Sequence, residues 1–217
     1  MCYSIIKTTE LLHLNEAAKA LKQKNFIITL NNGVTTLFGI DNVDSYIKFV
    51  DLNNNLFYNL ALKNAIINAR NLSAFIKTIT IEFEFEIKQK NNGILYITSS
   101  TGTELEFIYD KNIELIYLNK AYSILNYCNN NLPTVPEENV TDKLINLFSL
   151  HKEDGCLYYK HNNRYYITLF YGLLPLNKSD KILLSIYYNY NSKTFITKFK
   201  VIKKHFTINI YLNYLDL

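Results

Sequence analysis

The sequence is poor in the residues that usually form phosphate-binding loops. Its 217 residues include six glycines, three prolines and no tryptophan. A glycine-rich loop lets backbone N–H groups approach a phosphate closely, and this sequence has little glycine from which to build one. The motifs G-x-G-x-x-G, G-x-S-x-G and H-E-x-x-H are also missing. We therefore expect no enzyme and no cofactor.

Cysteine is also scarce. Cys2, Cys128 and Cys156 are odd in number and widely spaced, which argues against a disulfide framework and for a reducing compartment. The first residues lack a secretory signal, and no apolar run reaches the roughly 18 residues of a membrane helix, so we expect an intracellular protein with no membrane partner. His151 and His161 stand five residues on either side of Cys156, a spacing that does not match paired zinc ligands. We therefore expect no metal site.

Arginine occurs only as Arg70 and Arg164, whereas Lys, Asn, Ile and Tyr are abundant. This bias is typical of an AT-rich genome, such as that of a virus or phage. Because glycine is scarce, tight turns have to rely on asparagine, which tolerates positive φ better than most residues. We therefore interpret the asparagine clusters as turns between elements of secondary structure.

The composition, with 48% hydrophobic and 19% charged residues, is that of a folded protein. The net charge of +4 is unevenly distributed along the chain. Residues 140–217 contain eleven Lys and Arg against five Asp and Glu, a net charge of +6, and the rest carries −2. A basic half favours binding of a polyanion, although a solvated lysine-rich surface is the commoner explanation.

The start of the chain predicts one helix and four strands. The helix is capped by Thr8 or Thr9 and runs to about Gln23. Its apolar stripe consists of Leu11, Leu14, Ala18 and Leu21. Another side carries Asn15, Lys19 and Lys22. The strands follow at 26–30, 34–40, 45–51 and 56–60, with a hairpin turn at Asn31-Asn32-Gly33.

The next stretch predicts a helix over 62–77, followed by strands over 78–89, 94–98 and 104–109. On the helix, Lys63, Arg70 and Lys77 recur every seven residues and share one stripe. The first strand alternates apolar residues with glutamates, which predicts one buried and one acidic, wet face. The two sets are Ile81, Phe83, Phe85 and Ile87, and Glu82, Glu84 and Glu86. A basic helix stripe thus lies beside an acidic sheet face.

Residues 113–128 fit a helix or a strand about equally well. The Asn- and Pro-rich segment that follows predicts a linker over 129–139, between a first domain over 1–128 and a second over 140–217. Pro136 opens a third helix that runs to about Leu150 and carries Lys143. Strands are predicted at 156–161, 164–172, 181–190 and 205–214.

The segment 194–202 is ambiguous. Its β-branched and aromatic content favours a strand, in which Phe195, Thr197, Phe199 and Val201 face inward and Lys198 and Lys200 outward. A helix would instead gather Lys193, Thr197, Lys200 and Lys204 on one stripe. Basic helices that lie side by side would form a surface suited to phosphate contact regardless of base sequence.

These elements predict an α+β protein with antiparallel sheets and helices packed on one face, in two similar domains of which the second is reduced. The order of elements, the basic helices and the acidic strand face resemble those of DNA polymerase sliding clamps of the proliferating cell nuclear antigen and phage type. The most similar stretches are Asn68–Ile76 with the strands through Tyr109, and Thr141–Phe148.

The resemblance implies a processivity factor, a homotrimeric ring whose inner helices encircle duplex DNA. The residues that would contact DNA are Lys19, Lys22, Lys63, Arg70, Lys77, Lys143, Lys193, Lys200 and Lys204. It also implies that peptides of the DNA polymerase and clamp loader dock in an apolar pocket near the linker. Candidates for that pocket are Leu132, Leu215 and Leu217.

Two other interpretations stay open. A single-stranded nucleic-acid-binding protein would use the ten tyrosines after Val140 as stacking platforms among the lysines. A viral structural or protein-interaction β-rich domain would show no salt-dependent affinity for DNA. Quenching of tyrosine fluorescence by oligonucleotides distinguishes the first of these from a clamp.

Overall fold

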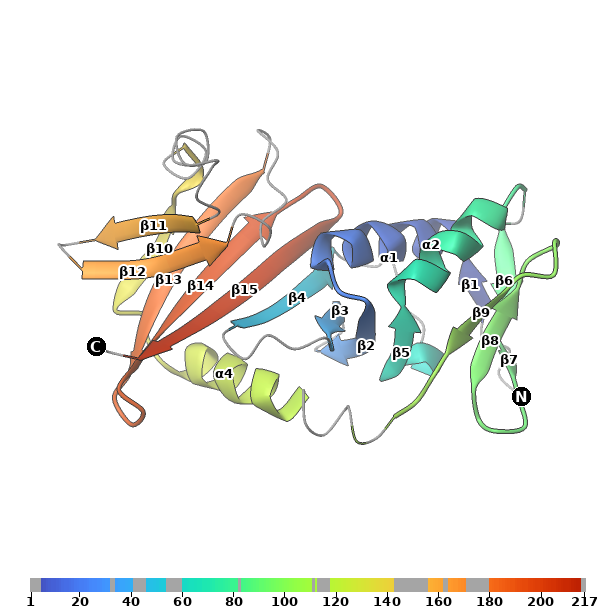
Figure 1. Ribbon diagram of the computed structural model, residues 1–217, viewed down its shortest axis with the longest axis horizontal. Helices are drawn as coiled ribbons and strands as arrows, with labels where there is room; N and C mark the ends of the chain where they lie inside the picture. Colours follow the sequence, from blue (N-terminus) through green and yellow to red (C-terminus); the bar gives the residue numbers. More distant parts are fainter. Residues whose placement is uncertain are drawn as a thin grey trace. The chain divides into compact units, whose positions relative to one another are not determined.

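The computed structural model describes residues 5–31, 34–40, 46–53, 60–81, 83–110, 112, 118–142, 156–161, 164–170 and 180–215. The chain divides into two compact units (Figure 1). The first unit combines Met1–Asn42 with Phe49–Lys120, and the second combines Val43–Lys48 with Ala121–Leu217. Both contain antiparallel strands and at least one helix, so the fold class is α+β as predicted.

The first unit holds a helix pair and three groups of antiparallel strands. Its helices are α1 (Thr8–Leu21), α2 (Ala69–Thr78) and a 3-10 turn at Leu60–Leu62. Its strands are β1 (Ile5–Lys7), β2 (Asn25–Asn31), β3 (Val34–Gly39), β5 (Ala65–Asn68), β6 (Glu84–Glu86), β7 (Lys88–Gln89), β8 (Leu95–Thr98), β9 (Glu104–Phe107) and the end of β4 (Tyr46–Leu52). The strands pair in the orders β5-β2-β3-β4, β7-β8-β9 and β1-β6.

Helix α1 forms where the sequence predicts it. Leu11, Leu14, Ala18 and Leu21 are all buried, which confirms the apolar stripe. The predicted cap at Thr8 or Thr9 is wrong, because the helix begins at Thr8 and its N-cap is Lys7, whose backbone N–H donates a 2.6 Å hydrogen bond to the side chain of Glu10. It ends at Lys22, whose φ of 56° places it in the left-handed region that stops a helix.

The predicted helix over 62–77 is wrong in its first half. Residues Ala65–Asn68 form strand β5, and the helix begins only at Ala69. Asn68 causes the change, because its side chain accepts hydrogen bonds from the backbone N–H groups of Arg70 and Asn71 at 3.0 and 3.1 Å. Lys63 therefore lies in a turn and not on the helix.

Helices α1 and α2 pack against each other and run antiparallel (Figure 1). At one end, the N–H of Ala69 donates to the carbonyl of Lys24, just beyond α1, at 2.9 Å. At the other end, the N–H of Thr8 donates to the carbonyl of Phe83, beyond α2, at 3.0 Å. Because α1 also contacts β3 and α2 contacts β5, the pair covers one face of the sheet β5-β2-β3-β4.

The alternating segment after α2 buries less than predicted. Phe85 is buried and its ring meets that of Phe75 edge to face, with centroids 5.4 Å apart. Ile81 and Phe83, however, are 79% and 80% exposed, because strand pairing starts only at Glu84. The predicted inner face of four apolar residues is therefore wrong at its first two positions.

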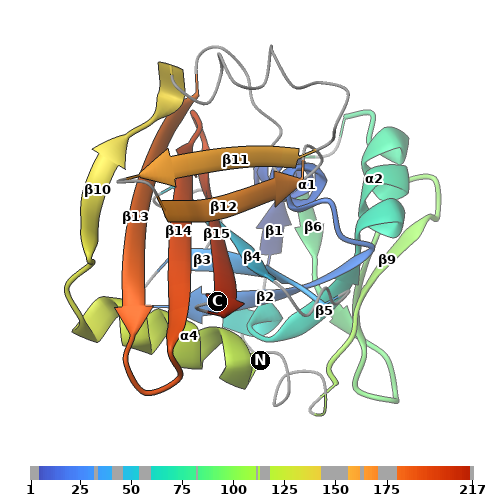
Figure 2. The same cartoon turned by 60° about the vertical axis from the view of Figure 1, so that its left-hand side comes forward.

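The second unit consists of helix α4 and a twisted antiparallel sheet (Figure 2). Its elements are α4 (Asn119–Asn130), β10 (Val135–Asn139), β11 (Cys156–His161), β12 (Arg164–Phe170), β13 (Lys181–Asn189), β14 (Thr194–Ile202) and β15 (Phe206–Leu215). The sheet order is β10-β13-β14-β15, and β11 and β12 form a separate hairpin that contacts the sheet through β12 and β14.

The segment predicted as a linker, 129–139, contains the end of α4 and all of β10. Pro136 was expected to open a helix, but it lies inside β10, where Val135 pairs with Ile186 on β13. A proline is tolerated there because β10 is the edge strand of this sheet.

Within the described residues, no helix is long and apolar enough to span a membrane.

The ambiguous segment 194–202 is a strand, as its composition favours. Thr197, Phe199 and Val201 are buried, whereas Lys198 and Lys200 are only half-buried. Phe199 pairs with Leu184 on one side and Ile210 on the other, so it lies at the centre of the sheet. The alternative helical stripe of lysines does not exist.

Candidate nucleic-acid interface

The outward side of α2 is polar and basic. Arg70, Asn71, Ala74 and Lys77 are exposed, whereas Leu72 and Phe75 on the opposite side are buried. Arg70 and Lys77 are seven residues apart, close to two helical turns, and therefore project from the same side. Two of the three members of the predicted stripe are thus on one helix face.

The polar side predicted for α1 loses one of its three members, although both of its lysines are exposed. Lys19 and Lys22 are exposed, and Lys19 shares its side of the helix with the exposed Leu12 and Glu16. Asn15, which was expected on the basic side, is 6% exposed and faces the interior. The reason is its spacing, because Asn15 follows Leu11 by one helical turn and lies on the same buried side.

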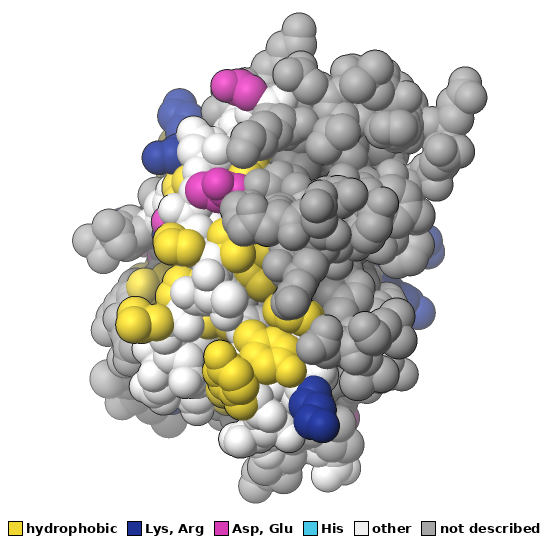
Figure 3. Space-filling view, turned by 90° about the vertical axis from the view of Figure 1, so that its left-hand side faces the viewer, with side chains coloured by type: hydrophobic (Ala, Val, Ile, Leu, Met, Phe, Trp, Pro, Cys, Tyr) yellow, Lys and Arg dark blue, Asp and Glu magenta, His cyan; other side chains and the backbone are white. Residues whose placement is uncertain are grey.

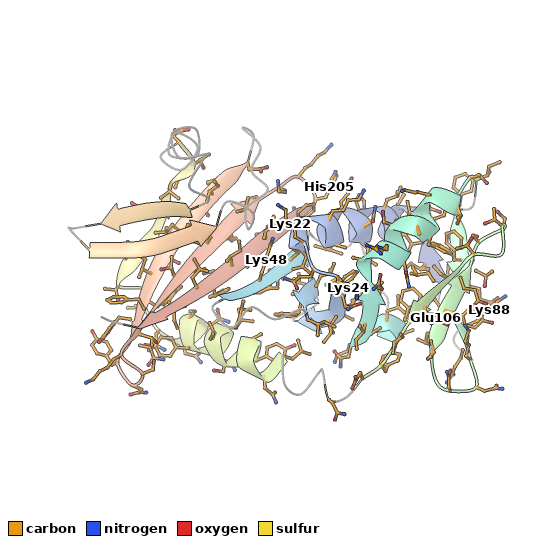
Figure 4. All side chains as sticks on the ribbon, viewed as in Figure 1. Lys22, Lys24, Lys48, Lys88, Glu106 and His205 are labelled. Atoms are coloured by element: carbon orange, nitrogen blue, oxygen red, sulfur yellow. The ribbon has the colours of Figure 1, made fainter. Side chains whose placement is uncertain are left out.

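Three basic residues come together where α1 ends and α2 begins. The bond from Ala69 to the carbonyl of Lys24 sets these ends side by side, and a 3.0 Å hydrogen bond from Asn68 Nδ2 to Asn25 Oδ1 reinforces the junction. Lys22 and Lys24, labelled in Figure 4, therefore lie on the segment next to Arg70. Lys24 was missed from the sequence because it follows the helix and belongs to neither stripe.

The helix dipole favours the positions of Lys19 and Lys77 but not that of Arg70. Lys19 is in the last turn of α1 and Lys77 in the last turn of α2, where a cation is favoured by the helix dipole. Arg70 is in the first turn of α2, where a cation is disfavoured. Its charge there does not stabilise the helix.

The exposed cations of the helix pair keep their charges available. Within the residues that the structure describes, Lys19, Lys22, Arg70 and Lys77 form no ion pair. Lys90 behaves differently, since its Nζ lies 2.8 Å from Glu104 Oε2 and 2.6 Å from Glu106 Oε1. The helix pair is therefore the better candidate for contact with an anion.

Strand β6 and the sheet β7-β8-β9 carry charges of both signs. Glu84 and Glu86 are exposed, as predicted, and Glu82 lies outside the described residues. Lys88 and Glu106, labelled in Figure 4, flank Tyr96 on neighbouring strands. The Glu104 and Glu106 hydrogen bonds raise the pKa of Lys90 well above its usual range.

Among the described residues, no three His, Cys, Asp or Glu side chains are grouped as metal ligands.

The basic candidates of the second half do not gather in one place. Lys193 and Lys204 lie in the turns at opposite ends of β14, which spans nine residues and hence roughly 30 Å. Lys200 lies on the strand between them. Lys143 is outside the described residues.

Of the three leucines predicted to form a partner pocket, the structure describes the side chain of Leu132 alone. Leu132 is 93% exposed in the loop between α4 and β10 and projects into solvent. Leu215 is the last residue of β15, and only its backbone is described. Leu217 lies outside the described residues.

No protein-family model and no curated protein sequence matches this chain. Solved structures do match it. One is A. fulgidus PCNA with the C-terminal region of FEN-1 bound, at a TM-score of 0.51 and 11% identity, covering 100% of both chains. Another is the DNA polymerase sliding clamp of Bacillus subtilis, at a TM-score of 0.53 and 12% identity, covering 98% of this chain and 64% of that one. The chain therefore has a sliding-clamp-like fold.

Proposed function

We propose that this protein is a DNA sliding clamp, a processivity factor that encircles duplex DNA and holds a polymerase on it without catalysing a reaction. The clamp-like fold supports this proposal at the level of architecture. The single observation that carries it is the exposed basic side of the antiparallel pair α1 and α2. Lys19, Lys22, Arg70 and Lys77 provide that side with positive charge.

This surface suits contact that is independent of base sequence. A lysine or arginine that meets a phosphate releases a counterion, and the contact carries no information about the base. No aromatic side chain lies among the exposed residues of α2, which are Arg70, Asn71, Ala74 and Lys77. The helix pair can therefore slide past phosphates without stacking on bases.

The ring requires contact between copies of the chain, and we propose a homotrimer. The first unit offers a suitable apolar surface in Ile81 and Phe83, which are 79% and 80% exposed beside the exposed Glu84 and Glu86. Large exposed apolar side chains that lie close together usually mark an interaction site. The second half of the sequence, with its net charge of +6, has the opposite charge that a head-to-tail contact would use.

The proposed partners besides DNA are peptides of the polymerase and the clamp loader. Support comes from the A. fulgidus PCNA structure, in which the C-terminal region of FEN-1 is bound. In this chain Leu132 is the described candidate for an apolar contact with such a peptide, since it projects from the loop between α4 and β10.

Duplex binding at several salt concentrations tests the DNA contact. Replacing both Arg70 and Lys77 by glutamate should weaken binding to a mixed-sequence duplex at least about tenfold and reduce the slope of log K against log salt by about two. Lys88→Glu is the matched control, because Lys88 is exposed on the outer strand β7 and should leave both quantities unchanged. Equal loss in the control and in the double variant would contradict the proposal.

The ring is tested separately by solution mass and by negative-stain imaging of the wild-type protein. A trimer with a central hole is the expected result. A strict monomer at high concentration, with no ring and no stimulation of a polymerase, would overturn the clamp assignment.

A further inference from the structure

The turn between β13 and β14 presents an open tyrosine that the clamp proposal leaves unused. Tyr190 is 80% exposed, whereas Tyr187 and Tyr211 in the same sheet are buried. Hydrophobic side chains gather on the face shown in Figure 3, with a Lys or Arg at one end of the group and side chains of both charges at the other. An aromatic ring left this open is available to stack against a ligand.

The open ring is held by a row of aromatic contacts. The rings of Tyr190 and Tyr188 meet at 89° with centroids 4.8 Å apart, and the ring of Tyr188 in turn lies 4.8 Å from that of Phe195. Helix α4 secures this row, because Tyr127 Oη donates a 2.8 Å hydrogen bond to the backbone carbonyl of Tyr188. Tyr190 is therefore braced against the sheet and does not hang on a free loop.

The turn itself is fixed by its own side chains. Asn189 Oδ1 accepts hydrogen bonds from the backbone N–H groups of Asn191 and Ser192 at 3.1 and 3.4 Å. The hydroxyl oxygens of Ser192 and Thr194 lie 2.7 Å apart. Lys193 completes the turn with a φ of 51° and an exposed side chain. A fixed turn loses little conformational freedom when it binds a ligand.

The turn that holds the ring carries a positive charge on Lys193. Lys181, Lys203 and Lys204 lie at the other end of β13 and β14. Within the turn, Lys193 is the charged side chain, and the remaining polar groups are the amides of Asn189 and Asn191 and the hydroxyl of Ser192. A ring beside a cation and neutral amides suits a ligand that combines a flat aromatic group with a negative charge.

We propose that the β13–β14 turn binds single-stranded nucleic acid, with one unpaired base stacked on the ring of Tyr190 and a neighbouring phosphate at Nζ of Lys193. Bases in a duplex already stack on each other, so the site takes a single strand. The proposal does not depend on the clamp assignment, because it uses the second unit and stacking, whereas duplex contact was assigned to the helices of the first unit.

The absence of tryptophan gives a direct probe of this site. Tyr190→Trp introduces the one tryptophan of the chain, and its fluorescence should be quenched when oligothymidylate is added and unchanged when the same amount of duplex is added. By fluorescence anisotropy with labelled oligothymidylate, Tyr190→Ala should weaken binding about tenfold, and Tyr190→Phe should keep wild-type affinity because the ring remains.

Lys193→Ala should weaken binding of oligothymidylate about threefold and lower its salt dependence, whereas Lys181→Ala, an exposed lysine at the other end of β13, should not. Equal affinity of the wild type and Tyr190→Ala would overturn the proposal, as would an unquenched tryptophan at saturating oligothymidylate. Binding of a proline-rich peptide that depends on Tyr190, without binding of oligothymidylate, would also overturn it and assign the site to a protein partner.

Discussion

Lys203 Nζ lies 2.7 Å from Asp180 Oδ2, and the two side chains are only 12% and 6% exposed. The pair joins the residue before β13 to the turn between β14 and β15, so it closes one end of the sheet. The N–H of Lys203 also donates to the carbonyl of Phe206 at 3.0 Å, which holds the same turn by its backbone. A buried pair of this kind is costly to break because the remaining charge loses its partner.

Asp180→Asn should therefore destabilise the protein by about 3 kcal/mol, since the largely buried ammonium of Lys203 loses the carboxylate that lies 2.7 Å from it. Urea unfolding followed by circular dichroism measures this change. The double variant with Asp180→Asn and Lys203→Met should be less destabilised than Asp180→Asn alone, because it removes both charges. A loss below about 0.5 kcal/mol for the single variant would show that the pair is screened by solvent.

Asn68→Ala should lower stability by about 1 kcal/mol, because α2 loses the acceptor for the N–H groups of Arg70 and Asn71. Asn68→Asp keeps this acceptor but cannot donate to Asn25 Oδ1, so it should recover only part of the loss. Thermal unfolding gives the comparison, and Asn71→Ala, at an exposed position on the same helix, is the control that should change little. A cost for Asn71→Ala as large as that for Asn68→Ala would argue against a capping role.

The buried thiol of Cys128 should react slowly with iodoacetamide. Burial raises its pKa to about 11, with a small opposing effect from Lys198. At pH 8 only about one molecule in a thousand then carries the reactive thiolate. Mass spectrometry of the peptide that contains Cys128 should show little modification in the folded protein and rapid modification in urea. Equal rates in the two states would contradict the buried environment.

The same thiol predicts how stability changes at alkaline pH. The folded state holds the proton of Cys128 more tightly than the unfolded state, so folding binds a proton between the ordinary thiol pKa and about 11. The free energy of unfolding should therefore fall as pH rises through this window. Cys128→Ala should flatten the fall, and an unchanged slope in that variant would assign the effect to another group, such as Tyr187, whose pKa is also raised by burial.

Local patterns predicted most of the described strands. Gly93 and Gly102 lie in the breaks between the predicted strands 78–89, 94–98 and 104–109, with φ of 82° and 81°, where a residue without a side chain is needed. The strand Thr194–Ile202 follows from its alternation of buried apolar residues with lysines. In each case a short stretch of sequence and the geometry of its own backbone decide the outcome.

The failures occur where distant residues decide. Ala65 and Ile67 face inward with the period of a strand, because β5 pairs with β2, and this pairing ends at the Asn68 cap. The acidic residues that follow Pro136 predict the first turn of a helix. The segment instead forms β10, an edge strand that pairs with β13. The spacing of Arg70 and Lys77 predicted that they share one helix face, whereas the position of Lys24 beside α2 depends on how the two helices pack.

Two apolar side chains in the first unit lead to the last prediction. Ile81 and Phe83 are 79% and 80% exposed, so they contribute little to the folding of one chain, and we propose that a second copy covers them.

Phe83→Glu should leave the thermal unfolding midpoint of the monomer nearly unchanged, because no buried contact is lost. It should shift the sedimentation equilibrium toward monomer, since the new carboxylate would be buried beside Glu84 and Glu86 without a partner. Leu132→Glu, at a position 93% exposed in the second unit, is the matched control and should keep the wild-type mass. Wild-type mass for Phe83→Glu as well would show that copies of the chain meet through another surface.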